Sequence, residues 1–199
     1  MINKQERAPL MEALSAFAEQ KPLSFHVPGH KNGQIFHKQG KDLFQRLLRI
    51  DATEVEGLDD LHAPEGAIQE AEQLLSEVYN TQKSYFLVNG TTCGNLAMIL
   101  GNCQEGDIVL VQRNCHKSIL NGLRLAKAKP VFLRNELNEE WEVAEGLSVH
   151  TVKKALERYS GAKALILTYP TYYGVANDIE EIIAVAHEHK VTVLVDEAH

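Results

Sequence analysis

Short apolar runs alternate with helical stretches from residue 85 onward, and this alternation restricts the possible folds more than any other feature. Five runs of four or five residues are candidate strands, at 85–88, 108–111, 130–133, 164–168 and 191–195. Between them, apolar residues recur at helical spacing at about 92–101, 117–126, 148–158 and 178–189. Nearly uninterrupted apolar strands joined by helices predict a mainly parallel sheet covered on both faces, so the expected fold class is a three-layer α/β/α sandwich.

The first part of the chain has a different pattern. Apolar residues at helical spacing predict helices at about 9–19 and 66–79. Between these helices, two prolines and two glycines within residues 22–33 forbid a helix and predict a shaped loop. We therefore divide the chain into an N-terminal helical arm with this loop, residues 1–60, and an α/β domain, residues 61–199.

Polar residues gather where the predicted strands end. The four sequences there are NGTT (89–92), QRNCH (112–116), YPTYYG (169–174) and DEAH (196–199). The carboxyl ends of parallel strands share one edge of a sheet, and ligands of such proteins bind outside that edge. We therefore expect a binding or catalytic site to be built from these four segments.

The composition excludes several classes of protein. The chain of 199 residues has a formal net charge of −7 and no block of Lys and Arg, which argues against a nucleic-acid partner. No apolar run reaches the roughly 18–20 residues that cross a bilayer, and the first residues lack the apolar core of a secretory signal. Three cysteines, Cys93, Cys103 and Cys115, are too few for a disulfide framework, so we expect a cytoplasmic protein without a membrane partner.

The segment from Asn89 to Thr92 follows a predicted strand and opens a predicted helix. Gly90 permits a tight turn, and the hydroxyl and amide groups of Thr91 and Thr92 suit an anion at the helix N-terminus. A simple helix cap by one of the threonines explains the same residues equally well. The Gly-x-Gly-x-x-Gly pattern of dinucleotide-binding proteins does not occur in the sequence.

Asp196 follows the strand predicted at 191–195. Taken alone, the Asp-Glu-Ala-His sequence that begins there matches a helicase box whose acid holds Mg²⁺ beside ATP phosphates. That function requires a Gly-x4-Gly-Lys-Ser/Thr loop, which the sequence lacks. The competing interpretation places the carboxylate of Asp196 against a protonated ring nitrogen, because a carboxylate beside a cation favours the charged form of both groups.

Histidines offer further candidate sites. His116 is either a surface histidine or a ring stacked on a planar cofactor. Cys115 and His116 could form a nucleophile and its base, but adjacent residues at a strand end point apart, which argues against that pair. His26 and His30 have the spacing of zinc ligands on a helix, but a Pro-Gly pair between them breaks the helix, so we expect no metal site.

Taken together, these segments resemble the Orn/Lys/Arg decarboxylase family of pyridoxal-phosphate (PLP) enzymes, which have the aspartate-aminotransferase-like fold. Six segments in the family's order and spacing carry the resemblance: FHVPGHKNG (25–33), LDDLH (58–62), NGTTCGN (89–95), RNCHKS (113–118), YPTYYG (169–174) and VDEAH (195–199). They extend over almost the whole chain. The resemblance implies that residues 61–199 are an incomplete PLP-binding large domain, and that the loop at 26–33 lies near a subunit interface and the active-site entrance.

The resemblance also implies roles for single residues. Asp196 would hold the ring nitrogen of the cofactor, His116 would stack on one face of its ring, and Ala198 would pack near the other face. Thr91 and Thr92 would bind its phosphate. Thr171 and His199 are similar to residues near its phenolic oxygen or the substrate. Asp196 and His116 are thus the expected catalytic residues.

The function implied is PLP-dependent decarboxylation of arginine, lysine or ornithine to an amine and CO2, as in polyamine biosynthesis, by a homo-oligomer of two or more subunits. The lysine that holds the cofactor in the family lies in a Ser-x-His-Lys segment, which this sequence lacks. We therefore expect the chain alone to be an inactive, truncated N-terminal portion. Alternatives are a PLP-dependent aminotransferase or lyase with the same pocket, and a non-catalytic fragment that pairs with another subunit.

Overall fold

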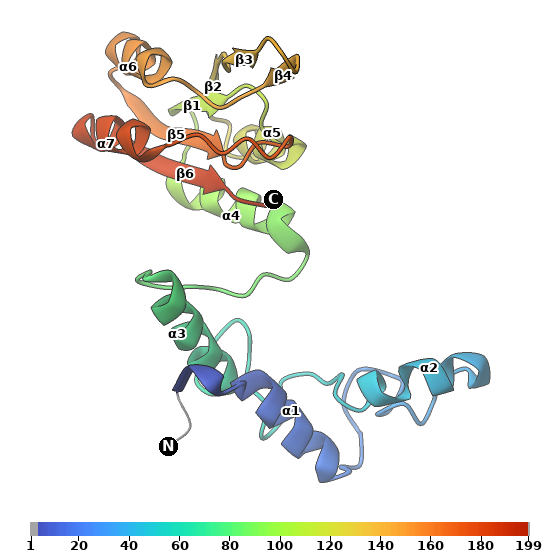
Figure 1. Cartoon of the computed structure of the whole chain (residues 1–199). Coiled ribbons are helices and arrows are strands. Elements are labelled where there is room, and N and C mark those ends of the chain that lie inside the picture. Colours follow the sequence, from blue (N-terminus) through green and yellow to red (C-terminus); the bar gives the residue numbers. More distant parts are fainter. Residues whose placement is uncertain (1–3, 199) are drawn as a thin grey trace. The chain divides into compact units, whose positions relative to one another are not determined.

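The computed structural model describes residues 4–198, and the chain divides into two compact units, residues 1–86 and 87–199 (Figure 1). No helix within the described range is long and apolar enough to cross a membrane. Helix α3 (Ala67–Tyr79) packs against α1 (Pro9–Glu19) in the first unit, whereas the division expected from the sequence grouped residues 61–86 with the sheet.

The first unit is helical. It contains the short 3-10 helix η1 (Lys4–Glu6), α1, α2 (Lys38–Leu48) and α3. The two predicted helices are confirmed, and residues 22–33 form a loop as expected. The sequence analysis missed α2, which begins after His37, whose Nδ1 accepts a hydrogen bond from the Gln39 N–H at 3.4 Å.

Asp59 organises the loop that leads into α3. Its Oδ1 accepts backbone N–H groups of Asp60 and Glu65, and its Oδ2 accepts those of Gly66, Ile68 and Gln69, at 2.8–3.3 Å. Burial raises the pKa of Asp59, but the backbone donors outweigh it and lower the pKa to about 2. Asp59 therefore caps the N-terminus of α3, although it lies seven residues before Gly66, the residue at the cap position.

The second unit is built on a parallel sheet. Its four strands are β1 (Ile108–Gln112), β2 (Lys129–Leu133), β5 (Ala162–Thr168) and β6 (Thr192–Asp196), in the order β2-β1-β5-β6. All three pairings are parallel, and in their register Leu110 lies opposite Val131 on one side and Leu165 on the other. A separate two-stranded hairpin consists of β3 (Leu137–Asn138) and β4 (Val143–Ala144).

Helices cover both faces of this sheet. Alternate residues of β1 and β5 pack against α4 (Gly90–Asn102) and α5 (Lys117–Leu125) on one face. The intervening residues pack against α6 (Val149–Arg158) and α7 (Glu180–Glu188) on the other face, as Figure 1 shows. The three-layer α/β/α architecture predicted from the alternation of strands and helices is thereby confirmed.

The strand predicted at 85–88 is wrong. These residues pair with none of the described strands, and all four side chains are exposed. An apolar run becomes a strand only where a neighbour accepts its backbone hydrogen bonds, and the described sheet provides none for this segment. The segment is irregular and leads directly into α4.

Candidate functional site

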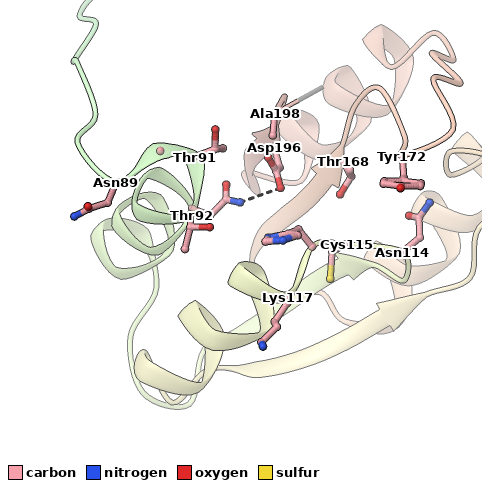
Figure 2. Close-up of a pocket in the computed structure, with 13 residues that line it drawn as sticks. Asn89, Thr91, Thr92, Asn114, Cys115, Lys117, Thr168, Tyr172, Asp196 and Ala198 are labelled. Carbon is pink, nitrogen blue, oxygen red and sulfur yellow. Dashed lines mark hydrogen bonds between the residues drawn. The ribbon is translucent and has the colours of Figure 1, made fainter. Parts of the chain in front are cut away.

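A cavity of about 500 Å³ opens where β1, β5 and β6 end and where α4 and α5 begin (Figure 2). Ten of its lining residues belong to the four segments that the sequence analysis placed at one edge of the sheet: Asn89, Gly90, Thr91, Thr92, Asn114, Cys115, His116, Tyr172, Asp196 and Ala198. The other three, Asn95, Lys117 and Thr168, lie close to those segments in sequence. The predicted location of a site at the carboxyl ends of the strands therefore coincides with a cavity of cofactor size.

The N-terminus of α4 forms one wall of the cavity. The chain enters the helix through two left-handed residues, Asn89 with φ of 69° and Gly90 with φ of 68°. Neither threonine caps the helix, because the structure shows no side-chain hydrogen bond to the cap, and the cap position belongs to Asn89. Thr91 and Thr92 lie within the first turn, where uncapped N–H groups and the helix dipole attract an anion.

Asp196 lies deep in the site. It is the last residue of β6 and is only 3% exposed. Oδ2 accepts a hydrogen bond from Asn95 Nδ2 at 2.9 Å, drawn as the dashed line in Figure 2. Oδ1 is buried without a hydrogen-bond partner among the described residues. A buried carboxylate oxygen without a donor is costly, so this atom suits a bound N–H group that carries positive charge.

Two buried residues connect Asp196 to His116. Besides its bond to Asp196, Asn95 Nδ2 donates to Ser118 Oγ at 2.8 Å. Ser118 Oγ lies 2.8 Å from His116 Nδ1, and the backbone N–H of Ser118 donates to the same ring nitrogen at 3.2 Å. His116 is thus also the cap residue of α5, which fixes its ring at the cavity wall.

The far end of the cavity is held by amide groups. Gln112, at the end of β1, donates through Nε2 to Asn114 Oδ1 at 2.8 Å and to the Thr168 carbonyl at 3.3 Å. Asn135 Nδ2 also donates to Asn114 Oδ1, at 2.9 Å. Thr168 Oγ1 is buried and has no partner within the described part of the chain. A second unsatisfied polar atom therefore lines the same cavity as Asp196.

Five of the seven site residues predicted from sequence line the cavity together: Thr91, Thr92, His116, Asp196 and Ala198. Thr171 is buried but lies outside the lining, and its hydroxyl accepts the Val175 N–H at 3.3 Å within a turn. His199 lies outside the described residues. The roles of all seven stay predictions.

Sequence reasoning missed Asn95, Lys117 and Thr168, which lie outside the four segments, and it did not single out Asn114 and Tyr172 within them. Asn95 had a usable signal, since it lies three and four residues after the two threonines and therefore on the same helix face. Thr168 ends β5 at the level where Asp196 ends β6, and the two are register partners. Tyr172 lies within the loop between β5 and α7, and the sequence does not determine the path of that loop.

Two reactive residue types in the lining are placed unfavourably for chemistry. Burial raises the pKa of the Cys115 thiol, and the charge of Asp196 raises it further, so the thiol stays protonated near neutral pH. This agrees with the argument against a Cys115–His116 nucleophile. The side chain of Lys117 points away from Asp196 along α5 (Figure 2).

Comparison with known proteins places these features in a family. Residues 8–199 match the family model described as Orn/Lys/Arg decarboxylase, major domain. The uncharacterized protein YaaO of Bacillus subtilis is 52% identical over 96% of this chain and 40% of its own length. An arginine decarboxylase of Bacillus anthracis is 38% identical over 98% of this chain and 40% of its own length. The chain thus spans about 40% of the length of these relatives.

Two solved structures are similar in fold. The constitutive lysine decarboxylase of E. coli matches with a TM-score of 0.81 and 22% identity, over 96% of this chain and 29% of that chain. A structure described as SPT with PLP matches with a TM-score of 0.52 and 27% identity, over 66% of this chain and 31% of that chain.

Proposed function

Because the chain belongs to the Orn/Lys/Arg decarboxylase family, we propose that it contributes the PLP site of an enzyme that decarboxylates arginine, lysine or ornithine. The observation that carries the proposal is the bare Oδ1 of Asp196, a buried carboxylate oxygen in the lining of the cavity. Such an atom is stabilised by a cationic N–H group, which a protonated pyridine ring provides.

The residues that line the cavity fit PLP in its other parts as well. The uncapped first turn of α4, with Thr91 and Thr92, suits the phosphate. His116 offers a flat ring and Ala198 a small side chain for the two faces of the pyridine. The cavity volume of about 500 Å³ is typical of a cofactor site.

PLP, when bound, supplies an electron sink that takes up the electron pair of the bond to the departing carboxylate. The protein supports that chemistry by holding charge and excluding water. Asp196 keeps the ring nitrogen protonated, because its carboxylate stabilises the cationic form. The dipole of α4 balances the phosphate charge. His116 covers one ring face, and Thr171 and His199 belong near the substrate in this proposal.

The remaining assignments follow from the relatives. The named relative acts on arginine, and we propose a basic amino acid as substrate, a homo-oligomer of two or more subunits as the assembly, and the cytoplasm as the compartment. Residues 61–199 then form part of the PLP-binding domain. The resemblance to a structure of SPT with PLP supports the cofactor more than the reaction.

The test uses a polypeptide that contains this sequence and has the full length of the curated relatives. It is called the full-length enzyme below. We expect it to bind PLP and to release CO2 and an amine from a basic amino acid. Release of a keto acid instead would assign an aminotransferase. The 199-residue chain has no Ser-x-His-Lys segment, so we expect no turnover from it with added PLP, and robust amine production would contradict this.

If the chain is instead a non-catalytic interaction fragment, it should sediment with the full-length enzyme and add no activity. Sedimentation of the 199-residue chain with and without that enzyme separates this alternative from the proposal.

A further inference from the structure

Asn95 and Ser118 are among the most buried polar residues of the second unit, and the proposed function gives neither a task. They are 3% and 2% exposed. Their side chains form the only described hydrogen-bonded path from Asp196 to His116, with lengths of 2.9, 2.8 and 2.8 Å along its three steps. Burying polar groups this deeply costs free energy unless they are hydrogen-bonded, so we looked for a function of their arrangement.

The Asp196 carboxylate, at one end of this path, indicates which atom donates in each hydrogen bond. The carboxylate of Asp196 only accepts, so the amide of Asn95 must turn its NH2 group toward Asp196. The same nitrogen donates its second hydrogen to Ser118 Oγ. The hydroxyl hydrogen of Ser118 is then directed at His116 Nδ1.

A second donor confirms this direction at the histidine. The backbone N–H of Ser118, which can only donate, points at His116 Nδ1 over 3.2 Å. Both donors need the lone pair of Nδ1, so the proton of the neutral ring belongs on Nε2. A proton on Nδ1 would break the contact with the backbone N–H, and it would reverse the contact with Ser118 Oγ, whose oxygen would then accept.

We propose that Asn95 and Ser118 are positioning residues that hold His116 as the neutral Nε2–H tautomer and hold Asp196 with Oδ1 left bare. The tautomer is a property of this chain alone. Its use rests on the proposed function: a neutral imidazole beside a cationic pyridine ring avoids the repulsion that an imidazolium would cause. The single path thus sets both groups that face the ring, an acceptor at its nitrogen and an uncharged plane on its face.

The experiment is ¹⁵N NMR of the full-length enzyme labelled in histidine, first without PLP, with His116→Gln identifying the resonances. We expect an unprotonated Nδ1 and a protonated Nε2. In Ser118→Ala one of two donors to Nδ1 is lost, and we expect the tautomer ratio to shift about fivefold toward Nδ1–H. Ser118→Thr keeps a hydroxyl and should restore the ratio.

Ser148→Ala is the matched control, since Ser148 caps α6 through its hydroxyl and lies outside the cavity lining. It should leave the His116 resonances in place. An Nδ1–H tautomer in the unaltered enzyme, or an unchanged ratio in folded Ser118→Ala, overturns the proposal. If circular dichroism shows Ser118→Ala unfolded, the unaltered enzyme and Ser118→Thr decide.

A second readout addresses Asp196. Asn95→Leu removes the only described donor to the carboxylate at similar volume, and we expect PLP affinity, measured by absorbance titration, to fall about tenfold. Unchanged affinity overturns the role of Asn95. An enzyme with the expected tautomer that binds no PLP would refute the proposed function and leave the tautomer assignment standing.

Discussion

At the scale of single residues, the site is defined by what is left unsatisfied. Asp196 Oδ1 and Thr168 Oγ1 are buried without partners within the described range, although Asn95 and Gln112 form hydrogen bonds with other atoms of the same two residues. Native proteins rarely leave such atoms bare, and a bound ligand is a physical reason to do so.

Asp196→Asn in the full-length enzyme tests the charge at this position. The amide keeps the size of the side chain but not the negative charge that favours a protonated ring nitrogen. We expect turnover to fall about a hundredfold or more, the range for loss of a preorganised electrostatic group. The melting temperature without PLP should not fall, because Oδ1 has no described partner to lose.

Asp178→Asn is a suitable control, since Asp178 accepts the Glu180 N–H at the start of α7 and is absent from the cavity lining. Near-normal turnover of Asp196→Asn would contradict the assigned role, and so would an equal loss in both variants.

The alkylation rate of Cys115, a residue of the cavity lining, tests whether PLP binds in the cavity. Because burial and Asp196 raise the pKa of its thiol, alkylation should accelerate only above the pH at which an ordinary thiol ionises. We expect PLP to slow this reaction, since Cys115 lines the cavity. Mass spectrometry of alkylated peptides measures it, with Cys93 as the internal comparison, and equal rates with and without PLP would contradict the location.

At the scale of elements, helices and strands are predicted correctly from the sequence where the local pattern and the tertiary contacts favour the same structure. The predicted strands β1, β2, β5 and β6 are confirmed because each apolar run has a parallel partner in the sheet, on both sides for β1 and β5 and on one side for β2 and β6. The run at 85–88 has the same composition but no described partner, and composition cannot show that. Helix α2 was missed because it follows a turn-rich loop and contains Gly40.

Prediction of the site divides in the same way. Residues at strand ends, such as Asp196 and His116, were found because topology alone brings them to one edge. Asn95 and Ser118 were not found, because their importance depends on hydrogen bonds between elements that are distant in sequence. Thr171 shows the converse: its segment reaches the site, but its hydroxyl closes a turn.

Asp59→Ala tests how one side chain supports a whole helix. Loss of the cap of α3 should lower the free energy of unfolding by about 0.5–2 kcal/mol at pH 7. The folded-state pKa of about 2 lies below the ordinary value of 3.8, so the contribution is present above about pH 4 and is lost as the pH falls toward 2. The difference between the two proteins in urea unfolding should therefore narrow at acidic pH.

Asp42→Ala provides the comparison, because Asp42 is exposed on α2 and no described hydrogen bond or ion pair involves it. It should change the free energy of unfolding by much less than Asp59→Ala. A difference for Asp59→Ala that stays constant from pH 7 to pH 3 would refute the capping role.

At the scale of the whole molecule, a parallel sheet with helices on both faces provides a rigid edge for the site. Four segments that are distant in sequence meet there, and the family match over residues 8–199 includes them all. The chain spans about 40% of its curated relatives, so the full-length enzyme is the proper subject for activity.

A crystal structure of the full-length enzyme with PLP tests the central claim most directly. We expect the phosphate at the first turn of α4 and the ring nitrogen within hydrogen-bonding distance of Asp196 Oδ1. An empty cavity at saturating PLP, or PLP bound with Asp196 turned away from its ring nitrogen, would contradict the account.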